Sequence, residues 1–286
     1  MNIQSIMLLI VTGVASGMVY YLTAAGLSIV IAGMDIVNFG AGAYYMFGAF
    51  LCYQITKTMG FGWSFLFIPL IIAAIGFCVE RILRKLYGRE KIYQLLFTMG
   101  IAYILQDILV FFYGYKLYTV NLPKTLKTAL RIGSFTFPKY YIFIIVVGGT
   151  IAMCLNFVFY KTKIGIIFRA IISDRTMANA MGINVGKMFA LMFAIATGLT
   201  GLAGVIISPT ITITATDSLG VFVNVMTVLR IGGWKSLKGA FIASVMMGII
   251  NAVAAKYLGS IYSVIPTIIM LVVLLVKPEG LFPEKR

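Results

Sequence analysis

The sequence predicts an all-α protein that crosses a membrane several times, and its composition gives the reason. Hydrophobic residues make up 61% of the 286 positions, charged residues make up 11%, and the mean hydropathy is +1.03. This leaves too little polar surface to cover a water-soluble domain. Apolar runs close to the roughly 20 residues that a spanning helix needs recur along the chain. We therefore expect one transmembrane domain over residues 1–286, with about eight to ten transmembrane helices.

Regular apolar segments in the first half of the chain are expected to span at residues 6–31, 62–82 and 92–112. The segment near 36–48 is different, because Asn38, Gly42 and Gly48 interrupt its apolar run. An amide and several glycines weaken a continuous helix and free backbone groups to face a cavity, so we expect a broken, pathway-lining segment. The alternative is a glycine-packed helix whose start Asn38 caps.

Two further features concern the predicted pathway. If the segment is helical, Asn38 and Gly42 share a face, and the missing side chain of Gly42 leaves room beside the amide for a small solute. Asp107 lies in the next apolar segment, where a buried carboxylate is costly unless it is paired or faces water. Asp107 either belongs to the pathway or lies near the outer end of its helix.

The second half of the chain has expected membrane segments at residues 140–160, 188–207, 241–255 and 261–276. Between them, residues 217–230 offer an apolar run of only about 14 residues, against the roughly 20 needed to span. The region 217–233 is therefore expected to be a tilted half-helix or a re-entrant segment.

A hydrophilic island at residues 161–187 separates two long apolar stretches. Residues 164–172 have helical spacing, and we expect them to continue the preceding helix. Ser173 is expected to cap a second, short helix over residues 174–181, which Gly182 ends. Eight helical residues extend only about 12 Å and are unstable alone, so this helix needs a partner surface.

Within that short helix, Arg175 and Asn179 lie four residues apart and share a face that can present polar contacts. Asp174 lies at the positive end of the helix dipole. The alternative is a solvated loop helix without a partner.

The basic residues predict an orientation. Sixteen of the 23 Lys and Arg residues lie in four places: 81–91, the island, 230–238 and the C-terminal tail. The positive-inside rule places these on the cytoplasmic side, with the N-terminus outside and the C-terminus in the cytoplasm. The loop at 113–139 then lies outside the membrane, although it carries five basic residues and no acidic one.

Several classes of function are excluded or disfavoured. The chain has no histidine, eight acidic residues and three cysteines without CxxC spacing, which disfavours a metal site, a disulfide or enzymatic catalysis. The net charge of +15 comes from clusters that flank apolar segments, so it indicates topology rather than nucleic-acid binding. No GxxxxGK[ST] motif occurs, so any ATPase must be a separate chain.

Several motifs resemble the permeases of branched-chain amino-acid ABC transporters, in particular the shorter of that system's two permease subunits. The residues that carry the resemblance are Asn38-Phe39, Gly42-Ala43, Gly165, Arg169-Ala170, Asp174, Gly182-Ile183-Asn184, Gly232-Gly233 and the ending Lys277-Pro278-Glu279-Gly280-Leu281-Phe282. The resemblance covers nearly the whole chain. It departs from the family at Ala41, where a histidine is usual, and at Lys235, which replaces a glycine.

The resemblance implies that the island is a cytoplasmic loop that docks into an ATPase subunit. The implied coupling residues are Arg169, Asp174, Arg175, Ala178, Asn179, Gly182 and Asn184. The implied translocation pathway contains Asn38, Phe39, Gly42, Gly48, Thr98, Gln106 and Asp107.

The resemblance also implies the partners and the mechanism. The chain would work by alternating access in a prokaryotic cytoplasmic membrane. It would act with two ATPase subunits that bind ATP and Mg, a second permease subunit or a second copy of this chain, and an extracytoplasmic solute-binding protein. Leucine, isoleucine and valine are the first expected substrates, before aromatic amino acids, urea and nucleosides. The alternative is an ion-coupled secondary transporter or a channel, but an ion-coupled carrier typically has intramembrane carboxylates or histidines.

Overall fold

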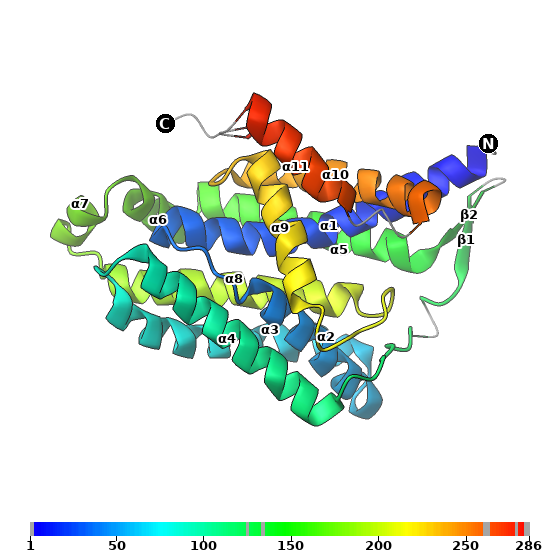
Figure 1. The fold of residues 1–286 in the computed structure, drawn as a ribbon, viewed down its shortest axis with the longest axis horizontal. Coiled ribbons are helices and arrows are strands. Elements are labelled where there is room, and N and C mark those ends of the chain that lie inside the picture. The colour runs from blue at the N-terminus through cyan, green and yellow to red at the C-terminus, as the bar shows by residue number, and fades with distance from the viewer. Residues whose placement is uncertain (1–2, 124–125, 133–134, 260–263, 278–279, 283–286) are drawn as a thin grey trace.

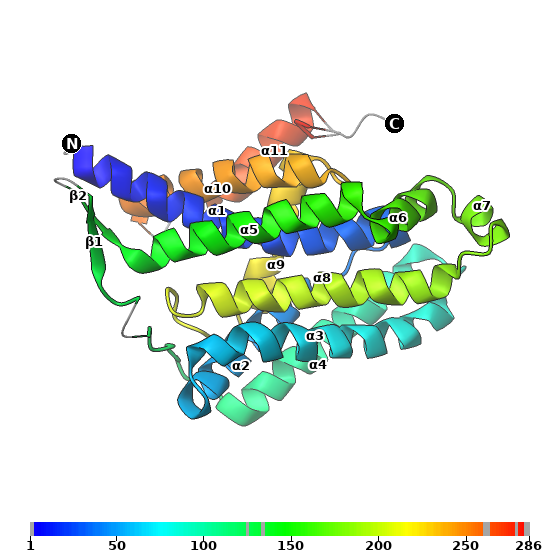
Figure 2. The same cartoon turned by 180° about the vertical axis from the view of Figure 1, so that it is seen from behind.

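The protein is described as a computed structural model over residues 3–123, 126–132, 135–259, 264–277 and 280–282. It is a bundle of helices that is elongated along one axis, as Figures 1 and 2 show from opposite sides. The helices are α1 (Ile3–Met34), α2 (Ala41–Thr58), α3 (Phe61–Leu83), α4 (Lys91–Tyr113), α5 (Lys139–Lys161), α6 (Lys163–Ser173), α7 (Arg175–Ala180), α8 (Val185–Ile207), α9 (Ser218–Gly232), α10 (Leu237–Leu258) and α11 (Ile265–Val276).

Helices α1 and α8 form the centre of the bundle. Helix α1 packs against α10, α8 and α5, and α8 packs against α3, α1 and α2. Glycines permit the closest crossings, because a Cβ at Gly204 of α8 would lie 2.1 Å from the carbonyl oxygen of Tyr45 in α2. Small residues at helix crossings let backbones approach, which is how membrane helices gain packing energy. The glycine-rich sequence of α8 therefore produces its buried position.

Six of the described helices are long and apolar enough to cross a membrane: α1, α3, α4, α5, α8 and α10. Helices α9 and α11 are apolar but have only 15 and 12 residues. At 1.5 Å per residue they extend roughly 22 and 18 Å, less than the roughly 30 Å hydrocarbon core. The predicted all-α membrane class is confirmed, whereas the predicted count of eight to ten spanning helices is not.

The structure corrects several predicted boundaries. The break predicted near 36–48 is confined to the turn between α1 and α2, so Gly42 and Gly48 lie inside a regular helix. Helix α6 does not continue α5, because Thr162 has an extended backbone and accepts a hydrogen bond from the Gly165 N–H. Asp174, rather than Ser173, caps α7, which is only six residues long.

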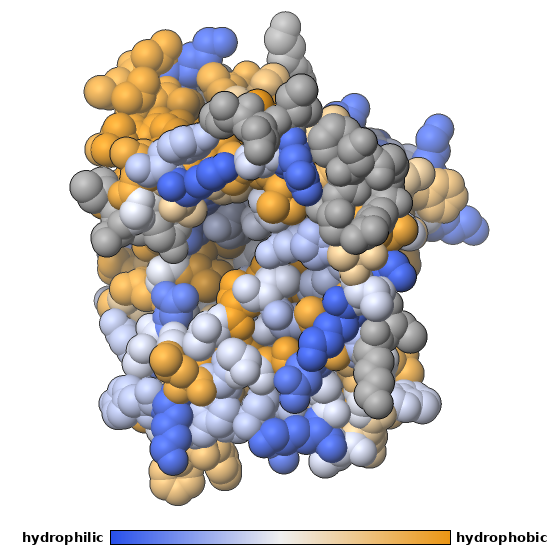
Figure 3. All heavy atoms as spheres, turned by 90° about the vertical axis from the view of Figure 1, so that its right-hand side faces the viewer, coloured by the Kyte–Doolittle hydropathy of each residue, from blue (hydrophilic) through white to orange (hydrophobic). Residues whose placement is uncertain are grey.

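The predicted loop at 113–139 contains a feature that the all-α prediction missed. Strands β1 (Ala129–Ile132) and β2 (Phe135–Pro138) pair antiparallel. In Figure 1 this hairpin lies at one end of the bundle, beside the start of α1, and α7 lies at the opposite end. Figure 3 faces the hairpin end and shows hydrophilic side chains over much of it, with hydrophobic ones toward the upper left.

Three of the four basic clusters that are predicted to share one side, and the described part of the tail, meet at the α7 end. Asp35 contacts both Lys91 and Lys235. Arg84 Nη2 donates to the Gly186 carbonyl at 2.6 Å, and the Leu281 N–H donates to the Ile231 carbonyl at 2.8 Å. These contacts join the 81–91 segment, the island, the 230–238 turn and the tail, as the charge pattern predicts.

Candidate functional site

The turn between α1 and α2 is held in place by local and long-range hydrogen bonds. Asn38, which is 4% exposed, accepts the Gly40 N–H on its side-chain oxygen at 3.0 Å. The Thr98 hydroxyl on α4 accepts the Phe39 N–H at 3.4 Å and lies 3.3 Å from the Val37 carbonyl. Asn38 therefore shapes the turn before α2, and Thr98 fixes the turn against α4.

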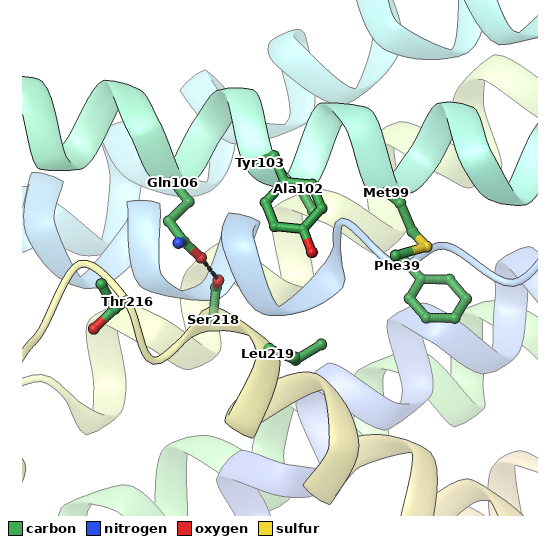
Figure 4. A pocket seen from close by; sticks show the side chains of 8 residues that line it. All are labelled: Phe39, Met99, Ala102, Tyr103, Gln106, Thr216, Ser218 and Leu219. Atoms are coloured by element: carbon green, nitrogen blue, oxygen red, sulfur yellow. Dashed lines mark hydrogen bonds between the residues drawn. The ribbon is translucent and has the colours of Figure 1, made fainter.

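A pocket of about 160 Å³ lies between this turn, α4 and the start of α9 (Figure 4). Its lining residues come from all three elements: Phe39, Met99, Ala102, Tyr103, Gln106, Thr216, Ser218 and Leu219. A cavity of about 150 Å³ can hold benzene, so this pocket has room for an apolar side chain.

The pocket is polar at one end and apolar at the other. Figure 4 shows Gln106, Ser218 and Thr216 at one end, and Phe39 and Met99 at the other. The Ser218 hydroxyl donates to the Gln106 side-chain oxygen, which joins α9 to α4 across the polar end. The first backbone N–H groups of a helix lack partners within the helix, so the start of α9 adds donors there.

Two of the predicted pathway glycines instead make helix contacts. A Cβ at Gly42 would lie 1.8 Å from the Ser218 carbonyl oxygen, and a Cβ at Gly48 would lie 2.4 Å from the Gly201 carbonyl oxygen. The predicted open space beside Gly42 is therefore wrong, because α9 fills it. Gly42 bears on the pocket indirectly, since it sets how closely α9 approaches α2.

Asp107 does not line this pocket. It lies one residue beyond Gln106 on α4, and its side chain is on an exposed face of the chain. Successive residues of an α-helix point about 100° apart, so neighbours in sequence face different surroundings. The structure thus places Phe39 and Gln106 in the pocket lining, with Thr98 bonded to the turn that carries Phe39, and leaves Asp107 outside the pocket.

A second cavity, of about 440 Å³, lies on another side of the start of α9. Its polar lining residues are Tyr20, Asp217, Asn224 and Asn251. Leu219 lines both cavities. The first turn of the half-length helix α9 is therefore next to open space on two sides, an arrangement typical of discontinuous helices in transporters.

The second part of the site is the projecting segment of α6 and α7. Asp174 accepts the Thr176 and Met177 N–H groups at 2.8 and 3.0 Å, and Asn184 accepts the Lys187 N–H at 3.0 Å. Gly182 has a φ of +84°, a conformation that residues with a Cβ rarely adopt. Asp174 therefore caps the start of α7, Gly182 follows its end, and Asn184 caps the start of α8.

Other predicted coupling residues differ in exposure. Ala178 is buried at 3%, whereas Arg169, Arg175 and Asn179 are exposed. Two apolar side chains that the sequence analysis did not select, Met177 and Met181, are 59% and 76% exposed. Figure 2 shows α7 projecting beyond the long helices. The segment therefore has both polar and apolar side chains exposed.

A buried carboxylate anchors this segment to the bundle. Glu80 on α3 is 0% exposed and accepts Arg84 Nη2 at 2.8 Å and the Tyr87 hydroxyl at 3.0 Å. Arg84 in turn donates to the Gly186 carbonyl at the start of α8. Because a buried carboxylate needs such partners, this network holds the end of α3 against the link between α7 and α8.

Asp35 makes a second connection at the same end. Its carboxylate contacts Lys91 and lies 3.6 Å from Lys235 Nζ. Burial alone raises the pKa of Asp35, but the hydrogen bond from Lys91 and the charges of Lys235, Lys91 and Arg175 together lower that pKa below its ordinary value. The carboxylate form thus ties the α1–α2 turn to α4 and to the α9–α10 turn.

The long apolar helices, the pocket at a half-length helix and the projecting short helix are together typical of a multi-pass membrane transport subunit. Comparison with known protein families shows to which family this chain belongs. The chain belongs to the family of permease components of branched-chain amino acid transport systems, which matches residues 9–274.

Individual relatives are distant in sequence but match over nearly their full length. The permease protein LivH of the high-affinity branched-chain amino acid transport system of Escherichia coli K12 is 28% identical, over 94% of this chain and 92% of LivH. BraD of Pseudomonas aeruginosa is 26% identical over 95% and 94% of the two chains. A probable LivH of Methanocaldococcus jannaschii is 26% identical over 91% and 87%. No solved structure gave a significant match.

Proposed function

We propose that this chain is the permease subunit of an ATP-driven importer of branched-chain or other hydrophobic amino acids, and that the pocket between the α1–α2 turn, α4 and α9 belongs to its pathway. The observation that carries the proposal is the polarity of the pocket, with Gln106 and Ser218 at one end and Phe39 and Met99 at the other. A hydrophobic amino acid is also polar at one end and apolar at the other, since its charged groups and its side chain lie at opposite ends.

The start of α9 supports the proposed orientation of the substrate. Free N–H groups and the helix dipole attract anions, so the substrate carboxylate would lie at the polar end. The apolar end then receives the side chain. Alternating access is proposed to change the contact between Gln106 and Ser218, because this contact joins α4 to α9 across the polar end of the pocket.

The proposed assembly contains two ATPase subunits that bind ATP and Mg, a second permease subunit or a second copy of this chain, and an extracytoplasmic solute-binding protein. Helix α7 is the proposed contact with the ATPase, through Arg175, Asn179 and the exposed Met177 and Met181. The α7 end is proposed to face the cytoplasm because the basic clusters at 81–91, in the island and at 230–238 meet there.

The test is a bulky substitution in the pocket, Ala102→Phe, measured as ATP-driven leucine uptake into vesicles that contain the purified transporter. We expect uptake to fall by about tenfold or more, because even one added methylene in a hydrophobic pocket changes specificity by about 10- to 200-fold. Valine uptake should be less affected than leucine uptake, since valine needs less of the remaining space.

Ile104→Phe on the same helix is the control, because Ile104 is 56% exposed and does not line the pocket. It should transport at the wild-type rate. Uptake is normalised to intact complex, so a loss that only follows poor assembly would not support the proposal. Wild-type leucine uptake by an assembled Ala102→Phe complex would refute this pathway.

A further inference from the structure

A long groove lies between α5 and α10, away from the proposed pathway. Its volume is about 820 Å³, and its lining is mostly apolar, with Met153, Phe157 and Ile242 among its exposed side chains. In Figure 2, α5 and α10 lie on either side of α1. Tyr21 of α1 also lines the groove, and its ring packs edge-on against Phe241 of α10 at 5.2 Å.

The length of the groove matches one leaflet of a bilayer. Along α5 its lining residues run from Gly149 to Lys161, which is twelve helical steps. At 1.5 Å per residue this is roughly 18 Å, close to half of the roughly 30 Å hydrocarbon core. Nothing lies within 4 Å of a Cβ built at Gly149, so the apolar end of the groove is open.

The other end of the groove is cationic. Lys161 is the last residue of α5 and Lys238 the second residue of α10, and both line the groove. Lys238 Nζ and the Arg169 guanidinium lie 5.5 and 5.6 Å from the ring centroid of Tyr160. Among the described residues, no acidic side chain pairs with Lys161, Lys238 or Arg169.

We propose that this groove binds an anionic phospholipid of the leaflet at the α7 end, with its phosphate between Lys161 and Lys238 and an acyl chain along α5 toward Gly149. Basic pockets between transmembrane helices bind anionic head groups in this way. The exposed amide of Asn156 lines the groove about 7.5 Å deeper than Lys161, at the depth of the glycerol esters.

Charge favours a lipid over a second copy of this chain. The whole sequence carries eight acidic residues against 23 basic ones, so a second copy has few carboxylates to place opposite this cationic end. A phospholipid supplies the missing negative charge and an apolar chain in one molecule. This inference does not depend on which solute is transported.

The test measures lipid binding to the delipidated, purified transporter complex by native mass spectrometry and thermal shift, with phosphatidylglycerol and phosphatidylcholine of identical acyl chains. We expect wild type to prefer phosphatidylglycerol. Lys161→Gln combined with Lys238→Gln should weaken phosphatidylglycerol binding about 30-fold, as expected for two interfacial lysines, and should remove the preference. Inorganic phosphate should not compete, because the acyl chain contributes to binding.

Lys57→Gln combined with Lys256→Gln is the matched control, since both lysines also lie over tyrosine rings, at 4.2 and 5.8 Å, but at the hairpin end. It should keep the preference. Gly149→Trp should block the groove and release the bound lipid, whereas Ile104→Trp on α4 should not. The proposal would be overturned if wild type bound the two lipids equally, or if the Lys161 and Lys238 variant kept its preference for phosphatidylglycerol. It would also be overturned if Gly149→Trp lost a protein subunit but kept its bound lipid.

Discussion

Single glycines decide how closely α2 approaches its neighbours. The nearest atom to a Cβ at Gly42 is a carbonyl oxygen of α9, and at Gly48 it is a carbonyl oxygen of α8. Both are backbone atoms, which cannot rotate away as the end of a side chain can. The pocket therefore depends on these glycines through helix packing, although neither lines it.

We expect Gly42→Ala to reduce assembly of the transporter. A methyl group 1.8 Å from the Ser218 carbonyl oxygen forces α2 and α9 apart. Overpacking of this kind typically costs about 1 to 3 kcal/mol. The measurement is the yield and melting temperature of the purified complex, together with uptake per assembled complex.

Gly100→Ala is the control for that substitution. Gly100 lies inside α4, and nothing lies within 4 Å of a Cβ built there. Replacing a helical glycine at such a site is expected to be neutral or stabilising by up to about 1 kcal/mol. If Gly42→Ala assembles as well as Gly100→Ala, the close crossing of α2 and α9 is wrong.

The sequence identified some of the residues that line the pocket but not others, and the difference has a physical reason. Phe39 and Gln106 were implied by the resemblance to the permease family, and both line the pocket. Ser218 and Tyr103 were not selected, because a serine at a helix start and a tyrosine in an apolar run are common. Ser218 becomes recognisable only when tertiary packing places it against Gln106, 112 residues away in sequence.

At the scale of elements, α7 is defined by its ends more than by its own residues. Asp174 caps the start, and the Ile183 N–H donates to the Ala178 carbonyl at 3.1 Å beyond the end. A helix of six residues is unstable alone in water. The caps of α7 and the hydrogen bonds around Glu80 therefore stabilise this short helix, and its outer face stays exposed.

We predict that Met177→Asp weakens retention of the ATPase subunits by about tenfold or more, because it puts a charge into the exposed apolar part of α7. The measurement is the amount of ATPase subunit that co-purifies with the permease as the concentration of the complex is lowered. Leu117→Asp is the control, since Leu117 is also a large exposed apolar residue, at 70%, but lies in the segment after α4. Equal ATPase retention in both variants would exclude docking through α7.

The sequence predicted the end of a helix correctly where a single residue type determines it. Gly182 was correctly predicted to end the short helix, because only a glycine adopts its φ of +84° easily. The cap was assigned one residue too early, since Ser173 and Asp174 are both good caps and adjacent. The separation of α6 from α5 was missed because Thr162 does not break a helix by residue type alone.

At the scale of the whole molecule, both ends of the bundle carry basic residues, as the five basic residues of 113–139 already indicated. Three basic clusters meet at the α7 end through Asp35 and Arg84, and the described part of the tail joins them there through Leu281. The hairpin end is also basic, with Lys116 and Lys127 exposed and Lys139 partly buried. The difference in charge between the two ends therefore comes from the number of basic clusters and from the contacts that these clusters share.

We predict that the hairpin end faces outward and the α7 end faces the cytoplasm. In a background without Cys52, Cys78 and Cys154, a single cysteine at Tyr115 should react with a membrane-impermeant thiol reagent in intact cells. A single cysteine at Arg89 should react only after the cells are opened. Tyr115 is 79% exposed and Arg89 is also exposed, so access through the membrane, rather than burial, decides the outcome. Labelling of Arg89→Cys but not Tyr115→Cys in intact cells would invert the topology, and α7 would then lie where no cytoplasmic ATPase can reach it.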